Sequence, residues 1–126
     1  MSQIITESLD VTGIARSMGT RVVYRAGNAI SRCGDPGKHM YVLPTGTVEV
    51  GRNGTVIEVI QPGDGLGILA LLDGKERSVD AIAETDAELA LIDARTFRYM
   101  VEEVPNFCWY VMDEMAQRLR ATNAAL

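Results

Sequence analysis

The sequence predicts a mainly β protein, in which an antiparallel sandwich or barrel of about residues 21–92 lies between one short helix and two C-terminal helices of about residues 94–126. Three observations lead to this prediction. The middle of the chain consists of short β-rich runs at even spacing, separated by turn residues. Two of these runs are joined by Asn53-Gly54, a dipeptide typical of a tight hairpin. Helical patterns occur only towards the two ends of the chain.

The first element is a short helix predicted over about residues 10–18. Asp10 or Thr12 can cap its N-terminus, and Gly19 ends it. The β-rich runs then follow in the order RVVYRAG, NAISRCG, HMYVLPTG, TVEVGRNGTVIEVIQPG, VDAIAET and AELALID. Short runs of this kind, each bounded by turn residues, favour an antiparallel sandwich or barrel.

The clearest local element is the hairpin within TVEVGRNGTVIEV. Val48 and Val50 alternate before the turn, and Val56 and Glu58 alternate after it. Asn53-Gly54 suits the two central positions of a type I′ turn, because both positions require a positive φ. We therefore expect an antiparallel hairpin with its tip exposed.

Two helices are predicted after the β region. Asp93 can cap DARTFRYMVEEV, which is broken before Pro105, a residue suited to the first turn of a last helix. In that last helix Phe107 and Val111 lie to one side, where they can pack on the barrel. The remaining positions form a stripe spaced by four and three residues, here called the C-terminal seam: Cys108, Met112, Met115, Leu119, Thr122 and Leu126. This spacing predicts a homodimer through the helix, and the alternative is that the seam covers the chain's own barrel.

Length and charge restrict the class of protein. The 126 residues, 47% of them hydrophobic, suffice for one domain, so residues 1–126 are treated as a single domain. The net charge of −5 provides no basic surface for a phosphate backbone, so we expect no nucleic-acid partner. No apolar run approaches the roughly 20 residues that span a bilayer. We therefore expect a soluble, cytoplasmic protein without a membrane partner.

Three closely spaced glycines, Gly63, Gly65 and Gly67, invite comparison with phosphate-binding loops. Their G-x-G-x-G spacing lacks the βαβ context of a dinucleotide fingerprint, and Lys75 is too distant for a Walker A loop. Glycine-rich turns at barrel corners are the plain alternative. The glycines alone therefore predict no particular ligand.

The sequence also lacks a recognisable catalytic or metal-binding arrangement. The single histidine, His39, stands beside Met40 and Tyr41 at a strand start and is interpreted as structural or exposed. The His, Cys, Asp and Glu residues show no ligand spacing. We therefore expect a binding protein rather than an enzyme, with no catalytic residues, no metal and no cofactor.

Four segments in order carry a family resemblance: RAGNAI, GKHMYVLPTGTVEV, VIQPGDGLGILALLDGKERSVDAIAETDAELALIDARTF and VPNFCWYVMDEMAQRLR. Together they resemble the cyclic-nucleotide-binding domain of the catabolite activator protein (Crp/Fnr-like) family and its relatives in kinases and channels. The resemblance covers roughly Arg21 to Thr122. It implies that the barrel is a jelly roll, that is, an antiparallel double-stranded β-helix.

Residues 62–79, here called the cassette, resemble that family's phosphate-binding segment. Pro62, Gly63 and Asp64 match its opening turn, Leu66 stands where phenylalanine is usual, and LALL matches its short helix. A guanidinium beside a glycine-rich cradle offers charge-assisted hydrogen bonds to a phosphate diester. The resemblance implies that the phosphate is held by Gly67, Ile68, Leu69, Arg77 and Ser78.

Other positions depart from the family or extend the implied site. Ile68 stands where the family has a glutamate that accepts from the ribose 2′-hydroxyl, and Val79 stands where alanine is usual. Losing a hydrogen bond to a charged group costs about 1.5–3 kcal/mol. By resemblance, Thr122 and Asn123 align with polar residues that reach the adenine, so Val79, Thr122 and Asn123 are the implied base-binding positions. No helix-turn-helix DNA-binding domain follows in this sequence.

Two hypotheses for the function result. In the first, the chain is a stand-alone regulatory sensor that binds a cyclic nucleotide, with cAMP favoured over cGMP, and acts on an unidentified effector protein. In the second, it is a degenerate domain that binds no nucleotide and serves in dimerisation or protein interaction. Arg77 and Ser78 favour the sensor, and Ile68 favours the scaffold. An arginine in an otherwise apolar cassette is costly unless an anion or a carboxylate accompanies it, which favours the first hypothesis.

Overall fold

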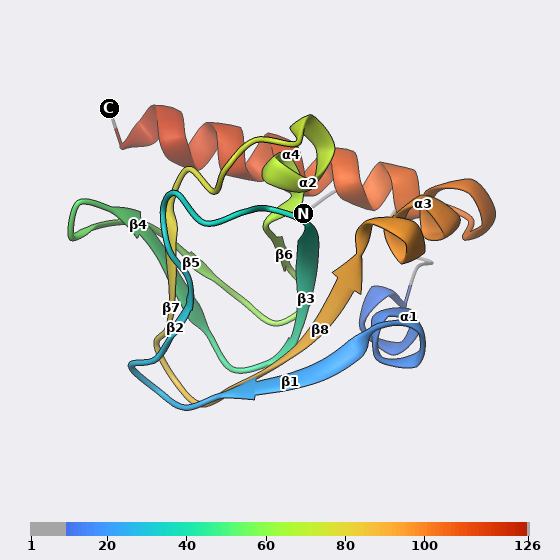
Figure 1. Cartoon of the computed structure of the whole chain (residues 1–126), viewed down its shortest axis with the longest axis horizontal. Coiled ribbons are helices and arrows are strands. Elements are labelled where there is room, and N and C mark those ends of the chain that lie inside the picture. Colours follow the sequence, from blue (N-terminus) through green and yellow to red (C-terminus); the bar gives the residue numbers. More distant parts are fainter. Residues whose placement is uncertain (1–9, 126) are drawn as a thin grey trace.

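The computed structural model describes residues 10–125 and shows two antiparallel four-stranded sheets folded against each other (Figure 1). One sheet has the strand order β1-β8-β3-β6 and the other has the order β2-β7-β4-β5. This arrangement confirms the predicted jelly-roll barrel. The strands are β1 (Thr20–Tyr24), β2 (Ala29–Ser31), β3 (His39–Thr45), β4 (Val48–Arg52), β5 (Thr55–Ile60), β6 (Gly65–Leu66), β7 (Asp80–Ala83) and β8 (Ala87–Asp93).

Among residues 10–125, four helices accompany the barrel: α1 (Val11–Met18), α2 (Ile68–Asp73), α3 (Ala94–Glu103) and α4 (Phe107–Ala124). Asp10 caps α1 by accepting from the Gly13 amide, and Asp93 caps α3 by accepting from the Thr96 amide, as predicted. Pro105 was expected to open the last helix at its first turn. It instead lies in the turn between α3 and α4, because Asn106, with a φ of 70°, separates it from α4.

The β4–β5 hairpin forms as predicted. Asn53 and Gly54 have φ values of 53° and 78°, so both central turn residues adopt the left-handed conformation of a type I′ turn. The register shifts between Val50 and Gly51, where the two strands contain a bulge. Val50 on β4 lies opposite Glu58 on β5. Because β5 contacts α4, Glu58 belongs to the strand that lies near that helix.

Two apolar clusters stabilise the fold, one between the sheets and one between the first sheet and the helices. Strand β3 contributes to both because its successive side chains point to opposite faces. Tyr41 and Leu43 belong to the cluster inside the barrel, whereas Met40 and Val42 belong to the cluster under the helices. His39 is two residues before Tyr41 and therefore lies on the barrel side of β3.

Helix α4 runs across one end of the barrel, with α2 against it (Figure 1). Phe107 and Val111 are buried as predicted, and they dock α4 on the helix-side cluster. The C-terminal seam mostly faces outward, since Met112 and Leu119 are more than half exposed and Met115 alone packs partly against the cluster. Leu126, the last seam position, lies outside the described residues. Within residues 10–125 no helix combines the length and apolar character needed to cross a membrane.

Candidate functional site

The candidate site is built where the loop after β2 meets the end of the cassette. The Gly34 amide donates to the Arg77 carbonyl at 2.9 Å, and the Arg77 amide donates to the Asp35 carbonyl at 2.8 Å. A β-bridge between Pro36 and Glu76 completes this short ladder. The ladder fixes the backbone of Arg77 and turns its side chain inward.

The Arg77 guanidinium is held between two main-chain carbonyls. Nη1 donates to the Gly67 carbonyl at 2.8 Å, and Nη2 donates to the His39 carbonyl at 2.6 Å. Gly67 has a φ of 81°, and a Cβ at that position would collide with the guanidinium. Glycine at position 67 is therefore required both by its left-handed conformation and by the close approach of Arg77.

Arg77 carries a buried charge without a carboxylate partner. Its side chain belongs to a residue that is only 5% exposed, yet in the part of the chain that the structure describes no Asp or Glu forms an ion pair with it. Its Nε also lacks a hydrogen-bond partner among residues 10–125. Burial lowers the pKa of the guanidinium, while Tyr41 and Asp35 act in the opposite direction. The arrangement leaves Arg77 able to bind an anion.

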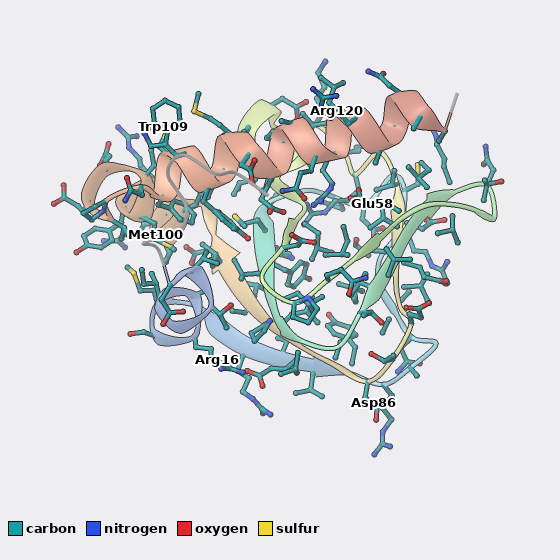
Figure 2. All side chains as sticks on the ribbon, turned by 180° about the vertical axis from the view of Figure 1, so that it is seen from behind. Arg16, Glu58, Asp86, Met100, Trp109 and Arg120 are labelled. Carbon is teal, nitrogen blue, oxygen red and sulfur yellow. The ribbon has the colours of Figure 1, made fainter. Side chains whose placement is uncertain are left out.

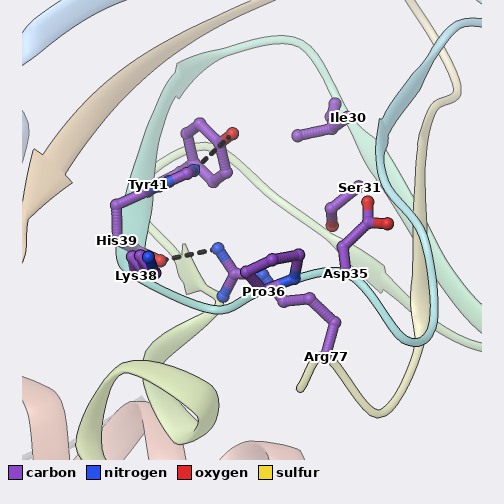
Figure 3. Close-up of a pocket in the computed structure, with 8 residues that line it drawn as sticks. All are labelled: Ile30, Ser31, Asp35, Pro36, Lys38, His39, Tyr41 and Arg77. Carbon is purple, nitrogen blue, oxygen red and sulfur yellow. Dashed lines mark hydrogen bonds between the residues drawn. The ribbon is translucent and has the colours of Figure 1, made fainter. Parts of the chain in front are cut away.

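A cavity of about 330 Å³ opens beside Arg77 (Figure 3). Tyr41 and His39 line one side from β3, and the residues of β2 and its following loop line the other. This volume is at the lower end of the range for small-molecule sites, roughly 300–1,000 Å³. The lining residues are Ile30, Ser31, Asp35, Pro36, Lys38, His39, Tyr41 and Arg77.

The remaining predicted phosphate residues lie near Arg77 in sequence but in different surroundings. Gly67 precedes α2 and contacts Arg77 through its carbonyl. Ile68 is 3% exposed and packs in the cluster under the helices, so its side chain points away from the cavity. Leu69 is 50% exposed on α2, and Ser78 is exposed after Arg77.

The predicted base-binding residues are not gathered in the cavity. Val79 packs partly against the cluster inside the barrel. Thr122 and Asn123 are exposed near the end of α4, and the Thr122 hydroxyl donates to the Arg118 carbonyl at 2.9 Å. Of the predicted ligand residues, all of which the structure describes, Arg77 is the one that lines the cavity.

Sequence reasoning missed His39 and Tyr41 as residues of the site. His39 is half-buried, and its Nε2 lies 3.0 Å from the Tyr41 hydroxyl. The signal was present in the run HMYVLPT, where residues two apart share one face of a strand. The interpretation of His39 as structural or exposed did not use this alternation.

A buried charged cluster joins α4 to the start of the cassette. Glu114 accepts from the Gly65 amide at 2.7 Å, and Arg118 donates to the Gly65 carbonyl at 2.9 Å. Arg118 also pairs with Glu114 at 3.0 Å and with Glu58 at 2.7 Å, and Glu58 lies below α4 in Figure 2. Burial raises the pKa of Glu114 to about 7, with a further increase from Asp64. The sequence analysis did not identify this cluster.

Comparison with known protein families decides the class of this site. The sequence model of the cyclic nucleotide-binding domain matches residues 21–104, from β1 to just after α3. The chain belongs to this family. The matched residues include the whole cassette and all residues that line the cavity. Helix α4 begins after the last matched residue.

Individual relatives agree with this assignment. The chain is 37% identical over 81 residues to the cAMP-dependent protein kinase regulatory subunit of Schizosaccharomyces pombe. This alignment covers 64% of this chain and 20% of the relative. The chain is 28% identical over 118 residues to the cyclic AMP receptor protein of Thermus thermophilus, which covers 90% of this chain and 55% of the relative. The chain thus spans about a fifth of the kinase subunits and about half of the bacterial regulators.

Solved structures show the same fold. The crystal structure of the Thermus thermophilus catabolite activator protein matches with a TM-score of 0.79 at 26% identity, covering 95% of this chain and 60% of that one. The N-terminal domain of a transcriptional regulator from Streptomyces coelicolor matches with a TM-score of 0.68 at 25% identity, covering 97% of this chain and 92% of that one. The chain therefore combines the jelly-roll fold of these structures with the sequence pattern of the cyclic nucleotide-binding domain family.

Proposed function

We propose that this domain binds a cyclic nucleotide, with cAMP favoured over cGMP, and acts as the regulatory part of a system that includes an effector protein. The observation that carries the proposal is the buried guanidinium of Arg77, which has two neutral carbonyl partners and no carboxylate among the described residues. A cyclic phosphate carries one negative charge and supplies the missing counter-ion. A buried charge without a partner costs several kcal/mol, so binding relieves a cost already present in the free domain.

In the proposed complex the phosphate contacts the guanidinium edge of Arg77, with Gly67, Ile68 and Leu69 contributing main-chain groups and Ser78 its hydroxyl. The ribose and base extend along the cavity. Val79 remains a proposed base contact, as do Thr122 and Asn123 if they belong to a second subunit. The names of the kinase and bacterial relatives, which specify cAMP, support cAMP as the first ligand to test.

The alternative of a degenerate scaffold receives no support from the relatives. It rested on Ile68 in place of a glutamate. The side chain at position 68 is buried under the helices, so its identity says little about the cavity. The effector remains a proposal, and the relatives' names suggest kinase or transcriptional systems as places to look for it.

Calorimetric titration of cAMP and cGMP into the wild type and three variants tests the proposal. Arg77→Ala removes the anion's counter-charge and should weaken binding by about 100-fold or more, while Arg77→Lys keeps a point charge and should weaken it about tenfold. Glu76→Ala, an exposed neighbour, should bind within about twofold of wild type. Circular dichroism establishes that each variant is folded. Equal affinity of wild type and folded Arg77→Ala contradicts the assignment.

A further inference from the structure

His39 and Tyr41 form a polar pair on the wall of the cavity that faces Arg77. They are two residues apart in β3, so both side chains lie on the barrel side of the strand (Figure 3). Their rings meet edge to face, with centroids 5.0 Å apart and an angle of 88° between the planes. The His39 Nε2 and the Tyr41 hydroxyl are 3.0 Å apart. Tyr41 also packs in the cluster inside the barrel, whose other members are apolar.

The His39 main chain is already part of the arginine site. Its carbonyl accepts from Arg77 Nη2 at 2.6 Å, so an anion that binds the guanidinium comes close to the imidazole. Two carboxylates beside the pair have other partners: Asp35, in the cavity lining, accepts from the Arg32 amide, and Asp93, opposite His39 on β8, caps α3. The charged and titratable groups around the pair are Arg77, Lys38, Asp35, Asp93 and, next to Tyr41, Tyr24.

These surroundings disfavour a protonated imidazole in the free domain. Burial lowers the pKa of His39, and the Arg77 charge lowers it further. A negative charge on Arg77 opposes the second effect directly, because it favours the cationic form of a nearby histidine. Burial also raises the pKa of Tyr41 to about 12, so the tyrosine keeps its proton near neutral pH. Its hydroxyl can donate to a neutral imidazole or accept from a protonated one, and the pair remains hydrogen-bonded in either state.

We propose that His39 and Tyr41 are further residues of the ligand site, and that His39 takes up a proton when a cyclic phosphate binds at Arg77. This inference rests on the proposed function. It makes ligand affinity depend on pH. Where the free domain carries a neutral His39 and the complex a protonated one, affinity rises as pH falls, by at most about tenfold per pH unit for one linked proton. Affinity is constant at pH values above the pKa of His39 in the complex and at pH values below its pKa in the free domain.

The test uses the untagged chain, in which His39 is the only histidine. Its imidazole carbon-proton resonance in an NMR spectrum is therefore assigned without mutagenesis, and its titration is followed with and without saturating cAMP. The pKa of His39 should be higher in the complex. Calorimetry in buffers of different ionisation enthalpy should show uptake of a fraction of a proton to about one proton, and the dissociation constant should fall severalfold from pH 8 to pH 6.

Two variants separate this effect from other titrations. His39→Gln keeps a polar partner for Tyr41 without a titrating group, and it should lose most of the pH dependence that wild type shows. Lys38→Gln removes an exposed charge from the cavity lining and leaves His39 in place, so it should shift affinity by a similar factor at every pH. Burial also raises the pKa of Glu114 to about 7, but Glu114 contacts Gly65 and does not line the cavity, so the midpoint of the His39 titration reports on His39 itself.

The outcomes distinguish this inference from the proposed function. Binding with the same affinity at pH 6 and pH 8, together with an unchanged His39 titration, overturns proton-linked binding and leaves the nucleotide site intact. The same conclusion follows if His39→Gln retains the full pH dependence. Absence of cAMP and cGMP binding at every pH overturns the proposed function and this inference with it.

Discussion

At the scale of single residues, Ile68 and Arg77 show how the cassette divides its side chains between two environments. Ile68 follows Gly67 directly, yet its side chain packs with the helices, whereas Arg77 returns to the Gly67 carbonyl from the end of the cassette. Because Gly67 adopts a left-handed conformation, the chain turns sharply there, so that the Ile68 side chain packs with the helices while the Gly67 carbonyl accepts from Arg77. The cassette therefore stabilises the fold with one face and lines the cavity with another.

This division predicts the effect of introducing the family's glutamate. Ile68→Glu places a carboxylate in an apolar cluster and should lower the free energy of unfolding by about 3 kcal/mol or more, without tightening nucleotide binding. Urea unfolding followed by circular dichroism measures the change. Leu69→Glu, at the neighbouring half-exposed position, is the matched control and should cost no more than about 0.5 kcal/mol. Wild-type stability of Ile68→Glu combined with tighter binding would show that position 68 reaches the ligand.

The residues of the site differ in how far the sequence could predict them. Arg77 was predictable, because its position in the family pattern and the cost of burying a lone charge agree. His39 was not assigned because its contact with Arg77 joins residues 38 apart in the chain, and the alternation of side chains in HMYVLPT, the local signal, was not used. Glu114 and Arg118 were missed for a related reason. Their partners, Gly65 and Glu58, are about 50–60 residues away in the chain.

At the scale of elements, α4 is attached to the start of the cassette by one stripe of polar side chains. Tyr110, Glu114 and Arg118 are spaced by four residues and therefore lie on one face of the helix. Tyr110 donates to the Gly63 carbonyl at 2.8 Å, while the other two satisfy the amide and carbonyl of Gly65. The short strand β6 thus takes much of its hydrogen bonding from a helix.

This attachment predicts a pH dependence of stability. The pKa of Glu114 is raised from 4.5 to about 7, so the folded protein binds this proton more tightly than the unfolded chain does. The contribution of Glu114 to the free energy of unfolding is therefore greatest below pH 4.5 and is lost as pH rises through about 7. In Glu114→Gln, which does not titrate, stability relative to wild type should increase by about 1 kcal/mol or more between pH 5 and pH 8.

Urea unfolding of both proteins at four pH values checks this prediction. The difference between the two curves removes the contribution of other groups, including that of His39. Ala116→Ser, a change at an exposed position of the same helix outside this cluster, is the control and should give a curve parallel to that of wild type. A constant difference between wild type and Glu114→Gln would show that Glu114 stays ionised throughout.

Elements governed by local rules were the ones that the sequence predicted well. The Asn53-Gly54 turn and the caps at Asp10 and Asp93 each depend on a few adjacent residues, and all three formed as expected. Strand β6 was missed because two residues give no periodicity and its pairing with β3 is long-range. The start of α4 was misplaced because Asn106 adopts a left-handed conformation that a sequence pattern does not reveal.

At the scale of the whole molecule, the outer side of α4 carries an apolar surface that the barrel does not cover. Trp109 lies on that side of the helix in Figure 2 and is half-exposed. Met112 and Leu119, on the same helix, are each more than half exposed. Helix α2 packs against α4 and adds two half-exposed leucines, Leu69 and Leu72. An apolar surface shared by two neighbouring helices is typical of a contact with another protein.

We propose that this surface pairs two copies of the chain. Each apolar side chain buried in the contact contributes about 1.5–3 kcal/mol, against the entropy lost on association. Leu119, at 63% exposure, tolerates an aspartate in the monomer, whereas in the paired seam the same aspartate is an unpaired buried charge. Leu119→Asp should therefore yield a monomer of unchanged barrel stability, and wild type a dimer. Light scattering at tens of micromolar, a concentration suited to a modest interface, measures both masses.

The matched control for that experiment is Val23→Asp. Val23 is 57% exposed on β1, which Figure 1 places at the opposite end of the barrel from α4, so this variant should remain a dimer. A monomeric wild type would leave Thr122 and Asn123 without a neighbouring cavity to enter, and base recognition would then fall to the residues around His39 and Tyr41. A dimeric wild type that Leu119→Asp does not dissociate would mean that the copies meet through another face. The oligomeric state therefore also decides which residues can recognise the base.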